Sequence, residues 1–360
     1  MQVDYRSSLD WIDVATIYSA HELFLLVSEQ PPNGERSKRE EPGKVVVTFL
    51  GRRILQAVAV VVAVYAVSFV VLYLIPGDTV LSLYAGGDAG NTMGPAELAK
   101  LRAEFGLDRP LFDQFLSGLG HALAGDFGHS LKTGQSTSEL IGIALPQTLA
   151  LVSASLMIAV VGGTALALLA TFIKRPWLRQ FLLGLPAVGA SLPTFWVGLM
   201  LVQVFSFQLR LLPAIGNEGT SSLVLPAITL ALPGGATVAQ VLAKSLRTTL
   251  QEPYVTTALA MGTDPRVIHL RDALRNAAIP ALTVSGVLVA NLLGGAVVVE
   301  SVFSRSGLGR ITVQAVLTHD IPVVQGVVVF SAALFVLVSL LVDLAYPLID
   351  PRLRPAPVKR

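Results

Sequence analysis

The sequence predicts an all-α protein that crosses a membrane about six times. Of its 360 residues, 53% are hydrophobic and only 14% are charged, far fewer charges than a soluble domain of this length usually carries. Apolar runs of about twenty residues recur along the chain, and each is long enough to cross the hydrocarbon core of a bilayer as a helix. The chain has no cysteine, which excludes disulfides and thiolate metal sites.

Residues 1–45 differ in composition from the rest of the chain. They contain a Pro-Pro pair at Pro31 and the charge run Glu35–Glu41, and their apolar piece Leu23–Val27 is too short for a secretory signal. We expect a mostly flexible cytoplasmic extension with at most one short amphipathic helix. An alternative is that translation begins within Val45–Val47; finding a peptide from residues 1–40 in the natural protein would exclude it.

The first span is predicted at about residues 54–75, within a segment 46–77 that Pro76-Gly77 closes. Residues 78–143 then form a long polar interval, in which we expect a small folded helical insert. One helix is predicted to open at Pro95 and a second at Pro110, the latter ending near Gly125. The apolar residues on one side of the second helix are Phe112, Phe115, Leu116 and Leu119.

The remaining spans are predicted in a core of residues 144–347, followed by a tail of residues 348–360. They lie at about residues 149–173, 181–207, 223–242, 277–302 and 323–344. Small residues crowd Gly162-Gly163, Gly234–Ala236 and Gly294–Ala296, which favours close contact between helices. Gln240 and Asn291 could line a pathway or bond across helices, and the sequence leaves both open.

Basic residues gather in alternate connections between the predicted spans. They are Lys174, Arg175 and Arg179 between spans two and three, Lys244, Arg247, Arg266, Arg271 and Arg275 between spans four and five, and Arg352, Arg354, Lys359 and Arg360 in the tail. The positive-inside rule therefore predicts that both termini are cytoplasmic and that the 78–143 insert lies outside.

The stretch Glu252–Thr283 carries helix signals of its own within the cytoplasmic loop 245–276. Pro253 suits the first turn of a short helix, Gly262 the turn after it, and Asp264 the N-cap of a second helix that ends near Pro280. On spacing, one face of the second helix contains Val267, Leu270 and Leu274. The pattern alone fits either an amphipathic loop covering the end of the bundle or a contact surface for a separate motor protein.

Few chemical groups point to catalysis or ion coupling. The sequence has no Gly-rich phosphate loop, and no acidic residue sits near the middle of a span, as an ion-driven carrier usually requires. An enzyme buried in the membrane would need a paired acid and base inside the bundle, and the sequence shows no such pair. The five histidines are scattered, so a solvated or capping role is expected for each of them.

Short motifs in a fixed order resemble the inner-membrane permeases of ABC importers, most closely the B-type subunits of the dipeptide/oligopeptide/nickel family. The 252–283 stretch contains Thr256-Thr257-Ala258, Gly262 and Leu274–Ala277, which are similar to the family's "EAA" loop. The other pieces are Ile75–Asp78, Phe105–Leu111, Gly125–Ser130, Leu145–Leu149, Leu192–Trp196, Leu225–Ala227, Val299–Phe303, Gly307–Arg310, Pro322–Gly326 and Asp350–Arg352. The resemblance covers about residues 46 to 354 and rests on joint order and spacing rather than on any single motif.

The resemblance implies a type I ABC importer permease fold in a bacterial inner membrane and a role in transport rather than in catalysis. The implied partners are a homologous C-type permease subunit, two ATP-binding subunits and an extracytoplasmic solute-binding protein, with membrane lipid around the spans and no nucleic acid. This chain would bind no cofactor, since ATP and Mg would sit on the partner subunits. Peptides are the default cargo; nickel complexes, glutathione or oligosaccharides are alternatives, and an ion-driven carrier is a remote one.

The resemblance also assigns candidate residues at the two ends of the bundle. The residues expected to contact an ATPase are Tyr254, Thr256, Thr257, Ala258, Leu259 and Gly262. Those expected at an outer gate, or in docking of the binding protein, are Glu300, Arg305, Arg310 and Asp320. Thr256 and Met261 depart from the family pattern, where arginine and lysine are frequent, which leaves the identity of the ATPase partner open.

Overall fold

A computed structural model describes residues 42–74 and 110–349. By its internal contacts the chain divides into two units, Met1–Arg52 and Arg53–Arg360. Of the first unit the structure describes only the beginning of helix α2 (Pro42–Leu74), whose remaining residues belong to the second unit. Residues 1–41 of the extension, the helix expected at Pro95 and the last eleven residues, 350–360, lie outside the described residues.

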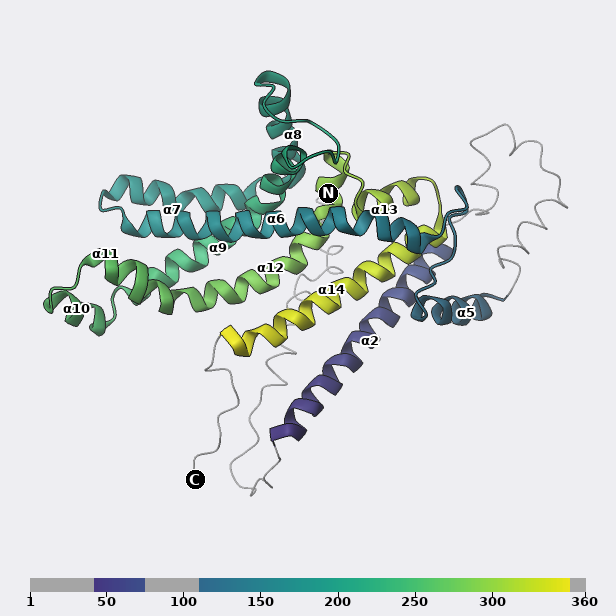
Figure 1. Ribbon diagram of the computed structural model, residues 1–360, viewed down its shortest axis with the longest axis horizontal. Helices are drawn as coiled ribbons and strands as arrows, with labels where there is room; N and C mark the ends of the chain where they lie inside the picture. The colour runs from purple at the N-terminus through teal and green to yellow at the C-terminus, as the bar shows by residue number, and fades with distance from the viewer. Residues whose placement is uncertain (1–41, 75–109, 350–360) are drawn as a thin grey trace, which may run out of the picture. The chain divides into compact units, whose positions relative to one another are not determined.

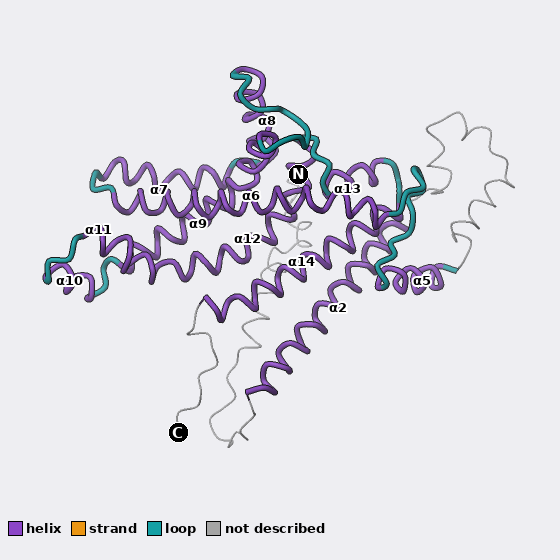
Figure 2. The backbone as a smooth tube through the Cα atoms, viewed as in Figure 1, coloured by secondary structure: helices purple, strands orange, loops and turns teal. Residues whose placement is uncertain are grey.

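Every regular element in the described ranges is a helix (Figures 1 and 2). The longest are α6 (Thr137–Phe172), α9 (Ser221–Thr249), α12 (Leu274–Val302) and α14 (Ile321–Ile349). Between them lie α5 (Leu111–Leu123), α7 (Pro176–Ser191), α8 (Thr194–Leu201), α10 (Pro253–Ala260), α11 (Pro265–Val267), α13 (Leu308–Leu317) and the π-helices η2 (Val202–Gln208) and η3 (Ile268–Ala273). An isolated bridge between His129 and Ser136 accompanies them.

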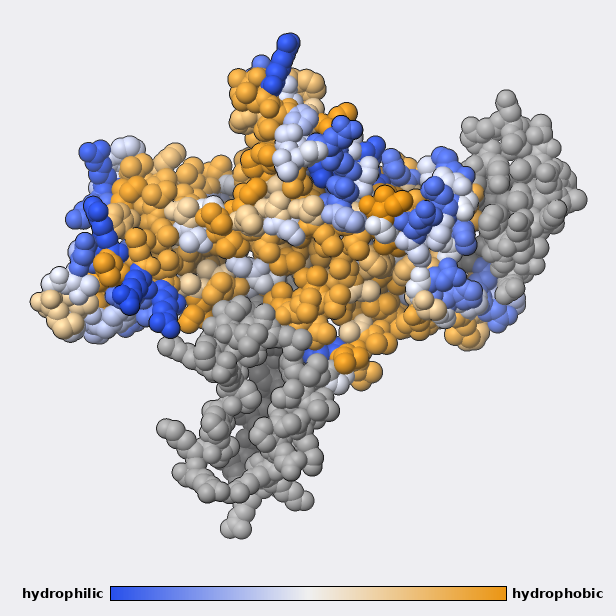
Figure 3. Space-filling model, viewed as in Figure 1, coloured by the Kyte–Doolittle hydropathy of each residue, from blue (hydrophilic) through white to orange (hydrophobic). Residues whose placement is uncertain are grey.

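Five described helices are long and apolar enough to cross a membrane, and a bent helix pair makes up to six. On the face that Figure 3 shows, apolar residues cover most of the described surface between the two ends of the bundle, and hydrophilic residues gather at those ends. The prediction of an all-α protein with about six spans is thus confirmed.

The third predicted span, residues 181–207, is a bent pair of helices and not one continuous helix. Helices α7 and α8 meet at an angle of 104°. The break falls at Leu192-Pro193, where both residues are extended, with ψ of 131° and 128°. A residue before proline is pushed out of the helical region, and proline then suits the start of a new helix.

Proline acts differently at residue 280. The second helix of the 252–283 stretch was expected to end there, but α12 continues through Pro280 as far as Val302. Helices in membrane proteins tolerate internal proline where their surroundings satisfy the freed backbone groups. As a result α11, η3 and α12 follow one another without a gap from Pro265 to Val302.

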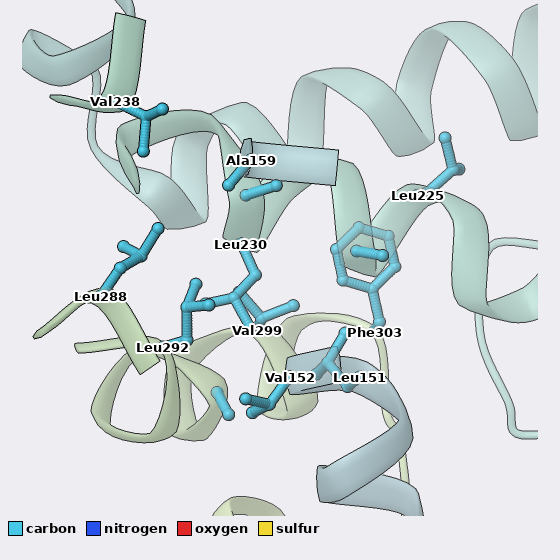
Figure 4. Packing of buried hydrophobic residues seen from close by; sticks show 13 residues of the cluster. Leu151, Val152, Ala159, Leu225, Leu230, Val238, Leu288, Leu292, Val299 and Phe303 are labelled. Carbon is cyan, nitrogen blue, oxygen red and sulfur yellow. The ribbon is translucent and has the colours of Figure 1, made fainter. Parts of the chain in front are cut away.

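The main hydrophobic core lies between α6, α9 and α12 (Figure 4). The buried side chains labelled there include Leu151 and Val152 of α6, Leu230 and Val238 of α9, and Leu292 and Val299 of α12. A second cluster joins the first turns of α6 to α13 and α14, and a third joins the last turns of α6 and α9 to η3 and α12.

Helices α6 and α9 approach each other at glycine. A Cβ added to Gly163 would lie 2.6 Å from the carbonyl oxygen of Gly235, closer than real side chains come. A Cβ on Gly235 would in turn lie 3.3 Å from the backbone of Ala159. The predicted close contact at these small residues is confirmed, because only residues with little or no side chain allow the two backbones to meet.

Helix α5 is the first described element of the insert, and it packs against α2 through part of its expected face. The ring of Phe115 lies 5.3 Å from those of Tyr65 and Phe69, and Leu119 joins the same cluster. Phe112 and Leu116 are instead 70% and 50% exposed. The expected apolar face is thus only half used within the described residues.

Candidate coupling surface and buried polar network

Helix α10 and the turn after it lie at one end of α9 and α12, the same end as the α6–α7 turn (Figure 1). Extended Glu252 precedes the helix, and Pro253 occupies its first turn. Val255 is buried, whereas Tyr254, Leu259 and Met261 are 40%, 47% and 76% exposed. The short helix therefore presents large apolar side chains at the end of the bundle.

The turn that follows α10 has the geometry predicted from its sequence. Gly262 has a φ of +82°, and the N–H of Thr263 donates to the carbonyl of Ala258 at 3.1 Å, which closes the helix end. Asp264 then caps α11, accepting a hydrogen bond from the N–H of Arg266 at 2.7 Å. The predicted glycine turn and N-cap are both confirmed.

The six residues expected to contact an ATPase all lie on α10 or in its turn. Tyr254, Thr256, Thr257, Leu259 and Gly262 are exposed and Ala258 is half-buried. The amide of Asn276 donates to the hydroxyl of Tyr254 at 3.3 Å, which ties α10 to α12. The side chains are therefore available for contact, and their role stays a prediction.

The prediction of which face of the second helix is buried was wrong, because the buried residues are shifted along the sequence. Val267 and Leu270 are 43% and 54% exposed, and the buried residues are Ile268, His269 and Ala273. The cause is the π-helix η3: its hydrogen bonds run over five residues, so Ile268 and Ala273 share a face that α-helical spacing would separate. Leu274 does pack against the adjoining cluster.

His269 is not solvated, in contrast to the expectation for histidines. It is 5% exposed, its Nε2 lies 3.0 Å from Oγ1 of Thr171, and its ring meets Phe172 edge-on at 5.4 Å. Both partners belong to the last turn of α6. The histidine therefore links the segment behind α10 to a membrane-spanning helix.

Glu300 is the centre of a polar network at the opposite end of α12. Its side chain is fully buried, and its carboxylate accepts hydrogen bonds from Oγ1 of Thr148 at 2.6 Å and from the N–H of Gly309 at 2.7 Å. The N–H of Arg310 adds a longer contact of 3.4 Å. Oγ1 of Thr148 also accepts from the N–H of Leu308 at 2.9 Å, so the network joins α6, α12 and the start of α13.

Arg305 forms a second buried connection in the loop after α12. Only 3% of it is exposed, and its guanidinium donates to the carbonyls of Gly216 and Ser222 at 3.3 and 3.1 Å and to Oε1 of Gln147 at 3.2 Å. Burial lowers the pKa of this guanidinium and the nearby charge of Glu300 opposes the shift. The positive charge fixes the loop between α12 and α13 against the segment before α9.

Asp320 fastens the described end of the insert to the start of α14. It is 4% exposed and accepts hydrogen bonds from the hydroxyl of Ser130 at 2.5 Å and from the N–H of Leu131 at 3.1 Å. Arg310 is half-buried, and its guanidinium donates to the carbonyl of Ser304. The side chains of Glu300, Arg305 and Asp320 therefore bond inside the chain and do not present their charges at its surface, and the expected role of the four residues in docking or at an outer gate stays a prediction.

Several residues of this network were not singled out from the sequence. Gln147 and Thr148 lie within a motif used for the resemblance, and Ser130 ends another, but their partners are 158, 152 and 190 residues away along the chain. Two polar residues at the start of an apolar span were the available signal. Spacing alone could not pair them with Glu300 and Arg305.

Two family models match most of the chain. Residues 46–152 match the model described as "Binding-prot-dependent transport system membrane comp, N-term", and residues 163–355 match "Binding-protein-dependent transport system inner membrane component". Among solved structures, the inward-facing MetNI methionine ABC transporter matches with a TM-score of 0.49 and 18% identity, covering 59% of this chain and 96% of that one.

Curated relatives match over nearly their whole length. A probable peptide ABC transporter permease of Sinorhizobium fredii is 36% identical over 314 residues, covering 85% of this chain and 99% of that protein. The glutathione transport system permease GsiC of Salmonella typhimurium is 36% identical over 313 residues, with 86% and 99% covered. A putative peptide transport system permease of Brucella abortus is 33% identical over 311 residues, with 84% and 98% covered.

Proposed function

The chain belongs to the family of inner membrane components of binding-protein-dependent transport systems, and we propose that it is one permease half of an ATP-driven ABC importer for peptides. It would pair with a homologous C-type permease, and the translocation pathway would run between the two. Two separate ATPase subunits would hydrolyse ATP, and an extracytoplasmic binding protein would deliver the cargo. The family assignment does not favour an ion-driven carrier.

The observation that carries the coupling role is the exposure of α10. Tyr254, Leu259 and Met261 present apolar surface beyond the end of the bundle, and such patches often mark contacts with other proteins. The residues that anchor the segment, Val255 and Ile268, face inward and are buried. One face of this segment is therefore fixed in the chain, and the other would fill a groove on an ATPase.

Motion of α10 has a continuous route to the other end of the bundle. Asn276 ties α10 to α12, the helical segment runs unbroken to Val302, and Glu300 near its end binds α6 and the start of α13. A displacement imposed on α10 would thus act on the outer connections through one rigid element. Coupling further requires that these contacts differ between the states with the pathway open to each side.

At the outer end, the insert and the loop before α14 would form the docking surface and gate. Glu300, Arg305 and Asp320 would act there from inside, by holding the connections that a gate must move, and Arg310 would lie closer to the surface. The charge pattern supports cytoplasmic termini. Segments 174–179 and 244–275, which contain the clustered Lys and Arg residues, lie at the α10 end of the bundle (Figure 1).

The relatives support peptides as cargo, since their names refer to peptides or to glutathione, itself a small peptide. Nickel complexes and oligosaccharides remain the alternatives expected from the wider family. The ligand that copurifies with the cognate binding protein would identify the cargo.

Crosslinking tests the coupling role directly, because the chain has no cysteine. In the assembled complex, a Leu259→Cys variant labelled with a benzophenone maleimide should crosslink to an ATPase subunit, with a yield that changes when ATP is bound. A Leu211→Cys variant is the matched control: it is also an exposed leucine, 68% exposed, on the segment that leads to the opposite end of α9. Equal crosslinking of both variants to the ATPase, or none at Leu259→Cys, would contradict the proposal.

A further inference from the structure

A cavity of about 380 Å³ opens between α6, α7 and α9, towards the end of the bundle that leads to α10. Its volume lies within the range of about 300–1,000 Å³ typical of small-ligand sites. One wall is apolar and the opposite wall, on α9, is polar. The apolar wall includes Leu166, Leu182 and Pro186, and the polar wall includes Gln240, Lys244 and Arg247.

The polar wall carries two positive charges that have no counterion. Lys244 and Arg247 are three residues apart on α9, a spacing that places both side chains on one face. Both residues are exposed, and within the described part of the chain neither side chain forms a hydrogen bond or an ion pair. Two adjacent cations with open donors favour an anionic ligand, and phosphate is the group such clusters commonly bind.

The surroundings of the cavity match the interface between membrane and water. The turn between α6 and α7 has Lys174 and Arg175, followed by Trp177, which is 66% exposed; these residue types are enriched at helix ends in the headgroup layer. From there, α7 exposes Phe181 and Leu185 along its length. Apolar helix surface thus continues from the cavity towards the middle of the bundle.

We propose that this cavity binds the headgroup of an anionic phospholipid, with its phosphate between Lys244 and Arg247 and its acyl chains along α7. Basic pockets between membrane helices bind such headgroups in other proteins. A soluble anion would use the two cations but not the exposed apolar surface of α7, and for that reason we favour a lipid. The inference goes beyond the transport function and does not depend on it.

Occupation of the cavity would bear on the packing behind α10. Leu183 of α7 lines the cavity and also packs against the cluster that joins the last turns of α6 and α9 to η3 and α12. A bound lipid would therefore hold α7 against the helices to which α10 is attached. Anionic lipid is expected to raise the heat stability of the complex as well as to bind.

The test uses the complete complex in nanodiscs of phosphatidylcholine that contain a minor fraction of photoactivatable phosphatidylglycerol. After illumination, mass spectrometry should find the label on peptides of α7 and α9. In the Lys244→Gln/Arg247→Gln variant this labelling should fall more than about tenfold, since each hydrogen bond from a charged donor to the phosphate contributes about tenfold or more. A Gln240→Trp variant keeps both charges but fills the cavity, and it should lose the label too.

The matched control is Lys174→Gln/Arg175→Gln, which removes one lysine and one arginine at the same end of the bundle but outside the cavity lining. Its labelling should change much less than that of the cavity variant, because neither of its side chains would contact the phosphate. Equal loss in both double variants would overturn the proposal in favour of general surface attraction. Equal labelling by a photoactivatable phosphatidylcholine would also overturn it, and so would full displacement of the label by inorganic phosphate. Absence of the label, because the second permease covers the cavity, would overturn it as well.

Discussion

Replacing Glu300 by alanine should destabilise the outer end of the bundle. The carboxylate is fully buried and accepts two short hydrogen bonds, at 2.6 Å from Thr148 and 2.7 Å from the N–H of Gly309. Each buried donor left without an acceptor costs about 1–3 kcal/mol. The threonine hydroxyl can turn towards a carbonyl of its own helix, so we expect a loss in the lower half of the summed range, about 2–4 kcal/mol.

The assay is thermal denaturation of the purified complex in detergent, followed by loss of the monodisperse species in size-exclusion chromatography. Ser301→Ala is the matched control: its exposed hydroxyl bonds only to the carbonyl of Val297 in the same helix, at 2.8 Å, and its loss should cost less than about 0.5 kcal/mol. Glu300→Gln keeps one acceptor and should fall between the two. If Glu300→Ala denatured at the same temperature as Ser301→Ala, the network would not hold the helices together as argued.

Three further predictions concern single positions. Gly262→Val should reduce substrate-stimulated ATPase activity of the complex, because a φ of +82° strains a β-branched residue by about 1–2 kcal/mol. Gly262→Asn, which tolerates this φ better, should retain the activity. Equal activity of the two variants would contradict this reasoning. Gly163→Val should block assembly of the bundle and Gly162→Val should not, since only a side chain at residue 163 would collide with α9. Equal yields of folded protein from the two variants would refute the close approach of the helices. The hydrogen bond from the N–H of Gly128 lowers the pKa of Asp126 below its ordinary 3.8. The carboxylate therefore stabilises its turn above that value and ceases to do so as the pH falls through the lowered pKa. The protection of the turn's amides from hydrogen exchange, relative to the intrinsic exchange rate at each pH, should fall at that acid pH, and in Asp126→Asn it should be low already at neutral pH.

The sequence was sufficient wherever one local rule decided the structure. Apolar length predicted the spans at α9, α12 and α14, and residue chemistry predicted the turn at Gly262 and the cap at Asp264. The resemblance to the permease family was confirmed by the family models and relatives. These features depend on a few consecutive residues or on motifs in a fixed order.

The features that sequence reasoning missed depend on tertiary contacts or on unusual backbone. The π-helix η3 shifted the buried face from Val267 and Leu270 to Ile268 and His269, and no spacing rule for α-helices anticipates that shift. The burial of Glu300 could not be predicted from its neighbours in the sequence, because its partners come from α6 and the start of α13. The break at Pro193 was visible as a proline, but Pro280 has the same signal and does not end its helix.

The most direct test of the proposed function is uptake of labelled peptide into proteoliposomes that contain this chain, its partner permease and the two ATPase subunits, with loaded binding protein outside. We predict uptake that requires ATP inside the vesicles and that Gly262→Val abolishes. Uptake driven by a proton or sodium gradient alone, without ATP or the ATPase subunits, would contradict the assignment of this chain as the permease half of an ATP-driven importer.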